Sequence, residues 1–306
     1  MALIHPTEAA SDGLFGHGAP HRSARDGAAD EVLGLSPSGV PLSLDRLVSL
    51  GRSSEVFRYG RGHVLKLYRA PGRPQDVVTE FRATRLAQDL GLPVPRAVAI
   101  LECEGRTGIL FEHLQGGTML DACRRRPLAT LTEIGRLARL QHAINACAGA
   151  CLPDQRETLR LQVEGARVPD AVRRAALAAL ARLPGGLRLC HGDLHPENVI
   201  CAPDGPRVID WQKATVGDPA ADVARTALLL RYGRIELGRL ARYLPVDAGR
   251  AALAWFYVEC RRQLGGPSRA EVAAWRLPLL VARLYGQPAA NEAEVLAAAE
   301  RLASRT

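Results

Sequence analysis

The distribution of apolar and polar residues divides the chain into three regions. Residues 1 to about 40 are rich in Gly, Ala, Ser, His and Pro and show no periodicity, which predicts a disordered tail. Short runs with alternating apolar residues continue to about residue 114, and they predict a small β-rich unit over 41–114. The expected strands of this unit are 46–50, 55–60, 63–69, 96–102 and 107–114, with one helix at 75–90.

Residues 115–306 carry helical periodicity over most of their length. The expected helices are 130–148, 154–166, 169–183, 219–232, 247–264, 268–284 and 291–304. A strand, a turn and a second strand interrupt them around 187–211, with the sequence Ala-Pro-Asp-Gly as the turn. The pattern therefore predicts an α+β chain, in which a small sheet precedes a larger helical unit.

Length and composition limit the class of protein. A chain of 306 residues exceeds what one hydrophobic core usually organises, so one large or two modest domains are expected. No apolar run approaches the roughly 20 residues that a membrane helix needs, and the N-terminal residues lack the basic and apolar segments of a signal peptide. The seven cysteines are scattered, without a C-x-x-C pair. We therefore expect a cytoplasmic protein with reduced thiols and no membrane partner.

The net charge of +8 does not by itself indicate a nucleic-acid partner, because the basic residues are spread along the whole chain. Aromatic residues make up only 5% of the chain, and the one dense basic cluster lies at 124–126. We expect no nucleic-acid partner. Of the 40 basic residues 38 are arginine, so Lys66 and Lys213 are the only lysines.

The stretch LCHGDLHPENVI at 189–200 places two histidines, two carboxylates and an asparagine between apolar ends. A zinc site is one interpretation, with His191, Asp193 and His195 as alternating ligands. Zinc sites of this kind need further His or Cys ligands from elsewhere in the chain. Of the eight histidines, three lie in the predicted tail and none follows His195, so such a site is poorly supplied with ligands.

A catalytic loop is the other interpretation of the same stretch. Asn198 follows Asp193 where the next apolar strand begins, and Asp210 ends the strand after it. We expect these three side chains to converge at one end of the predicted hairpin. A hard cation such as Mg²⁺ takes oxygen ligands and leaves room for phosphate oxygens, while a separate carboxylate can orient a hydroxyl and accept its proton. The spacing therefore indicates phosphoryl transfer, in which catalysis is mainly positioning and charge neutralisation.

The segments HGDLHPEN, VIDW and GDPAADVA, in this order, resemble the catalytic block of the aminoglycoside phosphotransferase and choline kinase family. The resemblance extends over about residues 45–285. It implies a two-lobed, protein-kinase-like fold, with a small antiparallel-sheet N-lobe at 41–114 and a larger helical C-lobe at 115–306.

The resemblance also implies roles for individual residues of the catalytic block. Asp193 takes the role of the catalytic base, and Asn198 and Asp210 become the Mg²⁺ ligands. Asp222 matches the carboxylate that braces the catalytic loop. His195 and Glu197 fit the motif, and we assign them to packing within the loop.

In a kinase of this fold, a strand lysine holds the α and β phosphates, and a helix carboxylate holds that lysine. Lys66 lies in an alternating strand between two leucines that point to the opposite face. Glu80, in the following helix, shares a stripe with Ala83 and Ala87, which we expect to face the sheet. A buried carboxylate needs a partner, and Lys66 is the one we predict.

Two further segments resemble nucleotide-binding parts of the family. The loop LGRSSEVF is similar to the loop that covers the nucleotide, where Gly51 permits the turn and Ser53 and Ser54 offer hydroxyl or N–H groups to phosphate. The segment ILFEHLQGG resembles the hinge between the lobes, where the backbone of Glu112 and Leu114 would contact the adenine.

The expected function is an ATP-dependent kinase that uses Mg²⁺ and transfers the γ-phosphoryl group to a hydroxyl of a small molecule. The acceptor would be a sugar, a nucleoside, a hydroxylated metabolite or an antibiotic. One alternative is a catalytically silent, nucleotide-binding regulatory protein with a kinase fold. The presence of all five polar residues that the reaction needs argues against it: Lys66, Glu80, Asp193, Asn198 and Asp210. A protein kinase is the other alternative. It is weakened by HGD and IDW in place of HRD and DFG, and by the lack of an activation segment ending in APE.

Charge gives an expectation about the acceptor. Residues 223–306 hold seven acids against 13 arginines and no lysine, a net of +6 (13 − 7). A polycationic aminoglycoside needs carboxylates around it, so we expect a neutral, singly charged or anionic acceptor, unless an acidic patch forms around Glu259. Many relatives also carry an acid after IDW, where Gln212 and Lys213 stand here, which puts a second carboxylate-rich metal site in doubt. The oligomeric state is not predicted.

Overall fold

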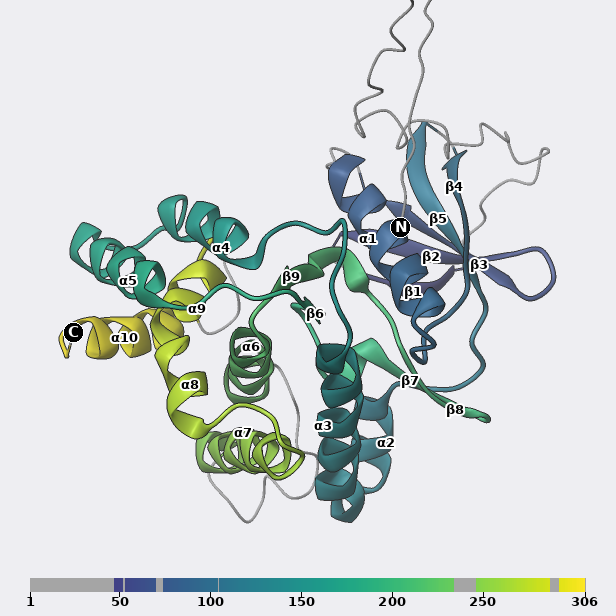
Figure 1. The fold of residues 1–306 in the computed structure, drawn as a ribbon. Helices are drawn as coiled ribbons and strands as arrows, with labels where there is room; N and C mark the ends of the chain where they lie inside the picture. Colours follow the sequence, from purple (N-terminus) through teal and green to yellow (C-terminus); the bar gives the residue numbers. More distant parts are fainter. Residues whose placement is uncertain are drawn as a thin grey trace, which may run out of the picture.

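The chain folds into two lobes in a computed structural model (Figure 1). The structure describes residues 47–51, 53–69, 74–103, 105–233, 246–286 and 292–305. A small antiparallel sheet with one helix forms the N-lobe, and the remaining helices form the C-lobe, which confirms the predicted fold class. The predicted tail at 1–40 lies outside the described residues, and the domain boundaries given above stay predictions.

The N-lobe is built on a five-stranded antiparallel sheet with the order β1-β2-β3-β5-β4. Its elements are β1 (Leu47–Leu50), β2 (Ser54–Tyr59), β3 (His63–Tyr68), α1 (Pro74–Asp89), β4 (Ala97–Cys103) and β5 (Arg106–Glu112). Strand β3 is central, so Lys66 pairs in register with Val56 on one side and with Ile109 on the other. The lysine is therefore held on a rigid strand.

Alternation along β3 puts Lys66 and its leucine neighbours on opposite faces of the sheet. Leu65 and Leu67 are fully buried in an apolar cluster on one face. Lys66 points to the face that α1 covers, where Val77 and Phe81 of the helix complete a second apolar cluster. The predicted alternation is confirmed, and the strand ends at Tyr68, one residue before its predicted end.

The small residues of α1 do not pack as predicted. Ala83 and Ala87 are fully buried in the main core of the C-lobe instead of facing the sheet. Their methyl side chains let α1 approach the turn Trp211–Lys213 closely, and α1 contacts this turn extensively. Helix α1 therefore packs on both lobes at once, and it carries Glu80 to the boundary between them.

The C-lobe is mostly helical. Its helices are α2 (Met119–Arg125), α3 (Thr130–Ala146), α4 (Gln155–Glu164), α5 (Asp170–Arg182), α6 (Pro219–Tyr232), α7 (Val246–Gln263), α8 (Arg269–Ala274), α9 (Arg276–Arg283) and α10 (Glu292–Ala303). Helix α2 was not predicted, although Thr118 and Asp121 form a capping box at its start. The predicted helix at 268–284 is instead α8 and α9, separated at Trp275. Pro278 explains this break, because its ring removes a donor and clashes with the carbonyl four residues earlier, where α8 ends.

The predicted strand–turn–strand unit at 187–211 is only partly correct. Strands β7 (Val199–Ala202) and β8 (Gly205–Val208) form the expected hairpin. The first strand, β6 (Arg188–Cys190), pairs instead with β9 (Thr215–Gly217), which was not predicted. The polar stretch at 191–198 therefore begins after β6, which pairs with β9, and ends before β7, which pairs with β8. Both of its ends are fixed by strand pairing.

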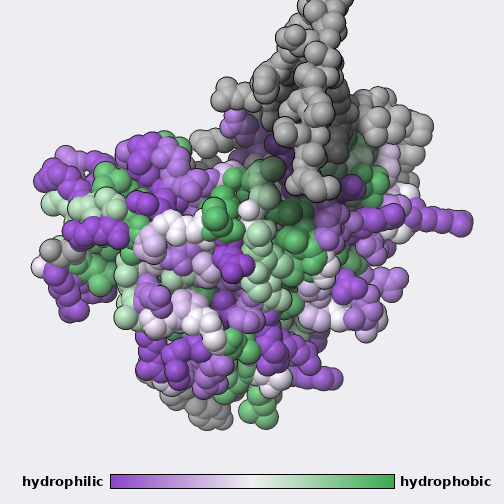
Figure 2. Space-filling model, in the orientation of Figure 1, coloured by the Kyte–Doolittle hydropathy of each residue, from purple (hydrophilic) through white to green (hydrophobic). Residues whose placement is uncertain are grey.

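On the face shown in Figure 2, hydrophilic residues cover most of the helical lobe, and hydrophobic residues gather towards the middle, where the lobes meet. Within the described ranges, no helix combines the length and the apolar content that a membrane crossing requires.

Candidate active site

A cavity of about 1320 Å³ lies between the two lobes and is lined by both. All ten residues predicted for the site lie on its wall. They are Gly51, Ser53, Ser54, Lys66, Glu80, Glu112, Leu114, Asp193, Asn198 and Asp210. The roles assigned to them stay predictions, but the fold brings segments separated by more than a hundred residues to one place.

Lys66 makes two ionic contacts in the wall of this cavity. Its Nζ lies 2.8 Å from both carboxylate oxygens of Glu80 and 2.6 Å from Oδ1 of Asp210. Burial alone would lower the pKa of Lys66, but the two carboxylates outweigh it and raise the pKa above its ordinary value. The ammonium is therefore charged at any physiological pH, as the predicted phosphate-binding role requires.

Glu80 is held from a second side by a group that was not predicted. The hydroxyl of Tyr68, two residues after Lys66 on β3, donates a hydrogen bond to Oε2 of Glu80. Burial raises the pKa of Glu80, against the opposing effect of Lys66. The carboxylate, only 1% exposed, thus depends on Lys66 and Tyr68 for its stability.

Asp210 and Asn198 offer oxygen atoms at the end of the β7–β8 hairpin. Asp210 adopts a left-handed backbone conformation, with φ 65°, which is uncommon for a residue other than glycine and turns the chain sharply after β8. The Nδ2 group of Asn198 donates to the carbonyl of Asp193 at 2.9 Å, so the amide oxygen stays available as a ligand. A carboxylate and an amide oxygen fit Mg²⁺, which completes its shell with water and phosphate oxygens.

The zinc interpretation finds no support in the described residues, where no three His, Cys, Asp or Glu side chains cluster as metal ligands. Both ring nitrogens of His191 are engaged, since Nε2 lies 3.1 Å from the carbonyl of Ile209 and Nδ1 accepts the N–H of Asp193 at 3.2 Å. Burial lowers the pKa of His191 and keeps the ring neutral. The ring packs on Trp211, with 4.7 Å between ring centroids. His191 therefore shapes the loop.

Gly192 and Asp222 set the course of the predicted catalytic loop. Gly192 has a φ of 74°, and a Cβ at this position would lie 2.1 Å from the carbonyl oxygen of Lys213. Only glycine fits there. The carboxylate of Asp222 accepts the N–H of Gly192 at 2.8 Å and that of His191 at 3.2 Å, so it braces the loop from below. Asp193 follows Gly192 directly, so these contacts also fix the backbone next to Asp193.

A buried polar chain extends from Asp222 away from the loop. Asn145 of α3 donates to Oδ2 of Asp222 at 3.0 Å, and Nη2 of Arg261 donates to Oδ1 of Asn145 at 2.9 Å. Arg261, on α7, is only 1% exposed. Sequence analysis missed both residues, because nothing local marks a polar residue whose partner is supplied by another helix.

Lys213 was also missed as a site residue. Its Nζ lies 2.6 Å from Oδ2 of Asp193, so each of the two lysines in the chain is paired with an acid of the predicted site. Burial would raise the pKa of Asp193, but Lys213, Arg225 and His195 together hold it well below its ordinary value. The rarity of lysine, which singled out Lys66, would have pointed to Lys213 as well.

Gln212 follows IDW, where the resemblance led us to expect an acid. Its Nε2 donates to Oδ2 of Asp76 on α1 at 3.2 Å, and its Oε1 accepts from the hydroxyl of Ser53 at 3.5 Å. The residue therefore links the helix and the predicted nucleotide loop of the N-lobe to the C-lobe. An acid here would face Asp76, and like charges would repel.

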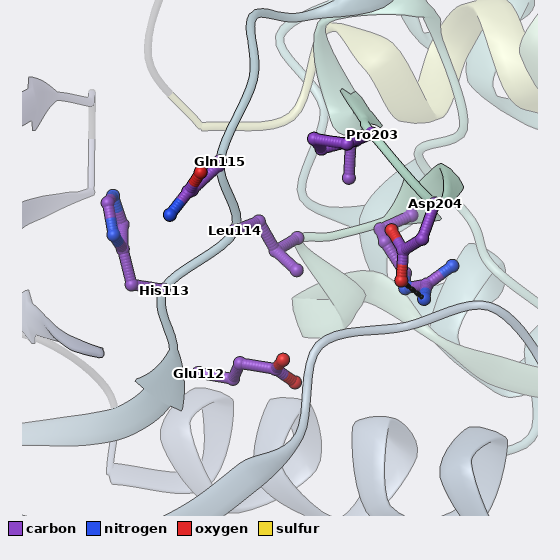
Figure 3. Close-up of a pocket in the computed structure, with 8 residues that line it drawn as sticks. Glu112, His113, Leu114, Gln115, Pro203 and Asp204 are labelled. Carbon is purple, nitrogen blue, oxygen red and sulfur yellow. Dashed lines mark hydrogen bonds and ion pairs between the residues drawn. The ribbon is translucent and has the colours of Figure 1, made fainter.

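The linker between the lobes runs past a second, smaller cavity of about 210 Å³ (Figure 3). Leu114 points across it towards Pro203 and Asp204 in the β7–β8 turn, while His113 and Gln115 point to the other side. The N–H of Glu112 donates to the carbonyl of Arg96, so only the Glu112 carbonyl could contact an adenine from this residue. The linker thus has the extended course of a hinge.

The profile of the Phosphotransferase enzyme family matches residues 46–256, which is more than half of the chain. The chain belongs to this family. The suspected membership is confirmed, and the match includes every predicted site residue.

Solved structures with the same fold include a thermostable mutant of aminoglycoside phosphotransferase APH(4)-Ia in ternary complex with AMP-PNP and hygromycin B. It is 18% identical, the alignment covers 85% of this chain and 91% of that chain, and the TM-score is 0.56. An aminoglycoside-3'-phosphotransferase of type VIII is 20% identical, with 78% and 93% coverage and a TM-score of 0.53. At these identities the likeness shows the fold alone.

Two curated relatives differ in how much of their length the chain matches. Acyl-CoA dehydrogenase family member 11 of Pongo abelii is 26% identical over 250 residues, which are 69% of this chain and 32% of that protein. The match therefore spans about a third of this relative. The uncharacterized protein YcbJ of Bacillus subtilis is 36% identical over 69 residues, 22% of each chain.

Proposed function

We propose that the chain is an ATP-dependent phosphotransferase that moves the γ-phosphoryl group to a hydroxyl of a small molecule. The observation that carries the proposal is the ion pair between Lys66 and Asp210, which joins the lobes beside Asp193 on one cavity. A strand cation, a carboxylate for a metal and a separate carboxylate for the acceptor are the parts that phosphoryl transfer needs. Membership of a phosphotransferase family supports the same reaction class.

The N-lobe end of the cavity binds ATP in this proposal. Lys66, oriented by Glu80, holds the α and β phosphates, because a compact ammonium with a raised pKa is a permanent point charge. The other proposed nucleotide contacts are Gly51, Ser53, Ser54, Glu112 and Leu114.

Asn198 and Asp210 would hold Mg²⁺ with their side-chain oxygens. The bound ion neutralises charge on the phosphate oxygens. The contribution of the chain is to fix these two oxygens, through the hydrogen bond from Asn198 to the Asp193 carbonyl and the left-handed backbone at Asp210.

Asp193 orients the acceptor hydroxyl. In the transfer, a bond forms between the acceptor oxygen and the γ-phosphorus, the bond from that phosphorus to the bridging oxygen of ADP breaks, and the hydroxyl proton passes to a carboxylate oxygen of Asp193. The lowered pKa of Asp193 makes it a weak base, so its main contribution is to position the hydroxyl. The proton then moves as the new bond forms.

The acceptor in this proposal is neutral, singly charged or anionic. The names of the solved structures favour an aminoglycoside as the competing candidate. The acidic patch that such a polycation would need does not form around Glu259, because hydrogen bonds from Arg262 and Arg269 neutralise this carboxylate and lower its pKa to about 2.

Other acids of the C-terminal helices are also engaged away from the cavity. Asp247 and Glu294 face Arg231 at 3.6 and 3.4 Å. Glu271 caps α8. None of these acids lines the cavity in the described part of the chain, and Glu236 lies outside that part. These acids of the C-terminal helices would therefore give a polycation in the cavity no compensating charge.

The experiment is an ADP-release assay with Mg·ATP and a panel of sugars, nucleosides, hydroxylated acids, hydroxylated amines and kanamycin, with labelled ATP and peptides as a further arm. The proposal expects acceptor-dependent ADP release with at least one small hydroxylated molecule, abolished in Asp193→Asn. Transfer to peptides alone, or nucleotide binding with no transfer to any panel member, would favour the protein-kinase and silent-kinase alternatives respectively.

A further inference from the structure

The cavity continues from Asp193 into the helical lobe, where α4, α6 and α9 form its wall. The side chains that line this end include Gln162, Arg225, Tyr232, Arg283 and Tyr285. No carboxylate comes from these three helices among the described lining residues, whereas two arginines do. We propose that this end of the cavity, the Arg225 end, binds an anionic group of the acceptor, a carboxylate or a phosphate. The inference rests on the proposed function and narrows its acceptor to hydroxylated anions.

Arg225 is the first residue that carries the inference. Its Nε is buried and has no hydrogen-bond partner among the described residues, and no carboxylate of these residues lies within ion-pairing distance of its guanidinium. Arg231, less than two helical turns further along α6, shows the contrast, because Asp247 and Glu294 neutralise it. A buried N–H group without an acceptor is costly. Asp193, the acid that Arg225 influences electrostatically, is already paired with Lys213.

Gln162 of α4 provides a second, independent observation at the same end of the cavity. Its Oε1 is buried and has no hydrogen-bond partner in the described residues. An orphaned acceptor atom in a cavity wall indicates a missing donor, such as a ligand hydroxyl or a water. A ligand with anionic oxygens would pair with Arg225, and a hydroxyl or amide donor on the same ligand would pair with Gln162.

The neighbouring side chains fit such a ligand. Tyr285 lies against Gly165, where a Cβ would be only 2.6 Å from its ring, so the ring is fixed as a wall beside the end of α4. Arg283 contributes a second guanidinium, whose Nη2 donates to the carbonyl of Tyr232 at 3.4 Å. Guanidinium groups match the planar oxygens of a carboxylate and the oxygens of a phosphate, and they hold either through paired hydrogen bonds.

One acceptor molecule would contact both Asp193 and the Arg225 end of the cavity. The reacting hydroxyl lies at Asp193 in the proposed function, and Asp193 and Arg225 line the same cavity. The anionic group and the reacting hydroxyl therefore belong to one small molecule. A polycationic acceptor would place ammonium groups against Arg225, which like-charge repulsion disfavours.

The test uses calorimetry on the full chain with saturating Mg·AMP-PNP, which fills the nucleotide end. Four ligands share one carbon framework and differ in charge: glycerol, glycerate, glycerol 3-phosphate and 3-amino-1,2-propanediol. Inorganic sulfate at constant ionic strength is the fifth probe. We expect sulfate and at least one of the two anionic ligands to bind about tenfold or more tightly than glycerol and the amine. Glycerate and glycerol 3-phosphate distinguish a carboxylate from a phosphate group.

Four variants test whether the anions bind at Arg225 and Gln162. Arg225→Gln removes the charge and is expected to weaken the bound anions about tenfold or more. Arg225→Lys keeps the charge and should retain part of the affinity. Arg174→Gln makes the same charge change on the exposed surface of α5, outside the cavity, and should alter nothing. Gln162→Leu should weaken the hydroxylated anion but leave sulfate unchanged. Affinity for Mg·AMP-PNP reports that each variant is folded.

The outcomes separate this inference from the proposed function. If Mg·AMP-PNP binds but none of the three anions binds in an Arg225-dependent manner, the inference is wrong and the phosphotransferase proposal stands. Preference for the amine, or an equal loss in Arg174→Gln, overturns it as well. Failure of the wild-type chain to bind Mg·AMP-PNP contradicts the proposed function and, with it, the inference built on it.

Discussion

Lys66 of β3 and Asp210 at the end of β8 are joined by an ion pair of 2.6 Å that crosses from the N-lobe to the C-lobe. The same ammonium is held by Glu80 of α1. The Lys66 ammonium on β3 thus contacts a carboxylate from α1 and a carboxylate that follows β8. In the proposed function these are the groups that bind phosphate and metal, so nucleotide binding and the closeness of the lobes depend on the same contacts.

Replacing Lys66 with Ala should raise the apparent KM for ATP and slow the reaction. The charge-assisted contact to phosphate is lost, and we expect an increase in KM of about 10- to 100-fold. Glu80→Gln should have the same direction of effect with a smaller size, because Lys66 stays charged through Asp210. Steady-state kinetics at varied ATP measures both. Normal ATP kinetics in Lys66→Ala would rule out this role for the pair.

Asp210→Asn should weaken Mg²⁺-dependent ATP binding and activity together. The variant keeps the shape of the side chain but removes a charged ligand from a hard cation. Calorimetry with AMP-PNP, with and without Mg²⁺, measures the effect. We expect the advantage that Mg²⁺ gives to nucleotide binding to shrink by about tenfold or more. An unchanged metal dependence would remove Asp210 from the metal site.

The local motifs predicted from sequence were placed correctly because each consists of residues close together in the chain. The strand around Lys66 and the hairpin that carries Asn198 and Asp210 follow from alternation and turn residues. The rarity of lysine marks Lys213, but its partner Asp193 could not be predicted from the sequence pattern, because the pairing depends on the turn of the loop at Gly192. Contacts of this kind arise from tertiary packing.

Two further misses have different physical origins. Strand β9 is only three residues long, and its pairing with β6 joins segments that flank a whole hairpin. The break between α8 and α9 had a local signal in Pro278, which was overlooked within an otherwise continuous helical pattern. For the proposed acceptor end of the cavity, sequence analysis supplied only the net charge of residues 223–306. Helical periodicity does not tell which of the arginines lines a cavity.

Asn145 should contribute to both stability and catalysis. Asn145→Ala leaves the buried Arg261 without its acceptor and removes one support of Asp222. We expect the free energy of unfolding to fall by about 1–3 kcal/mol, and kcat to fall while the KM for ATP is little changed. Chemical denaturation and steady-state kinetics measure these effects.

The control for this prediction is Arg262→Ala on the same helix as Arg261. Arg262 is about half exposed and pairs with Glu259 at 2.6 Å on the surface. Its loss should cost less than about 1 kcal/mol and leave kcat unchanged. Equal effects from Asn145→Ala and this control would contradict a specific role for the buried chain.

Lys213 should set the acid limb of the pH–rate profile. Lys213 helps to hold the pKa of Asp193 below its ordinary value, so Lys213→Ala raises that pKa and Asp193 becomes protonated at a higher pH. The acid limb of kcat/KM should therefore move to higher pH, and Lys213→Arg, which keeps the charge, should restore most of the wild-type profile. A limb that does not move in Lys213→Ala would show that Asp193 does not control it.

The most direct test of the account combines nucleotide binding and transfer in Asp193→Asn. The variant keeps the size of the side chain but removes the carboxylate that orients the acceptor hydroxyl, while Lys66 and Asp210 stay in place. Calorimetry with Mg·AMP-PNP and acceptor-dependent ADP release are measured on the same preparation. The account predicts nucleotide affinity within a few-fold of wild type and a loss of turnover of about 10²–10⁴-fold. Near-normal turnover in Asp193→Asn would contradict it.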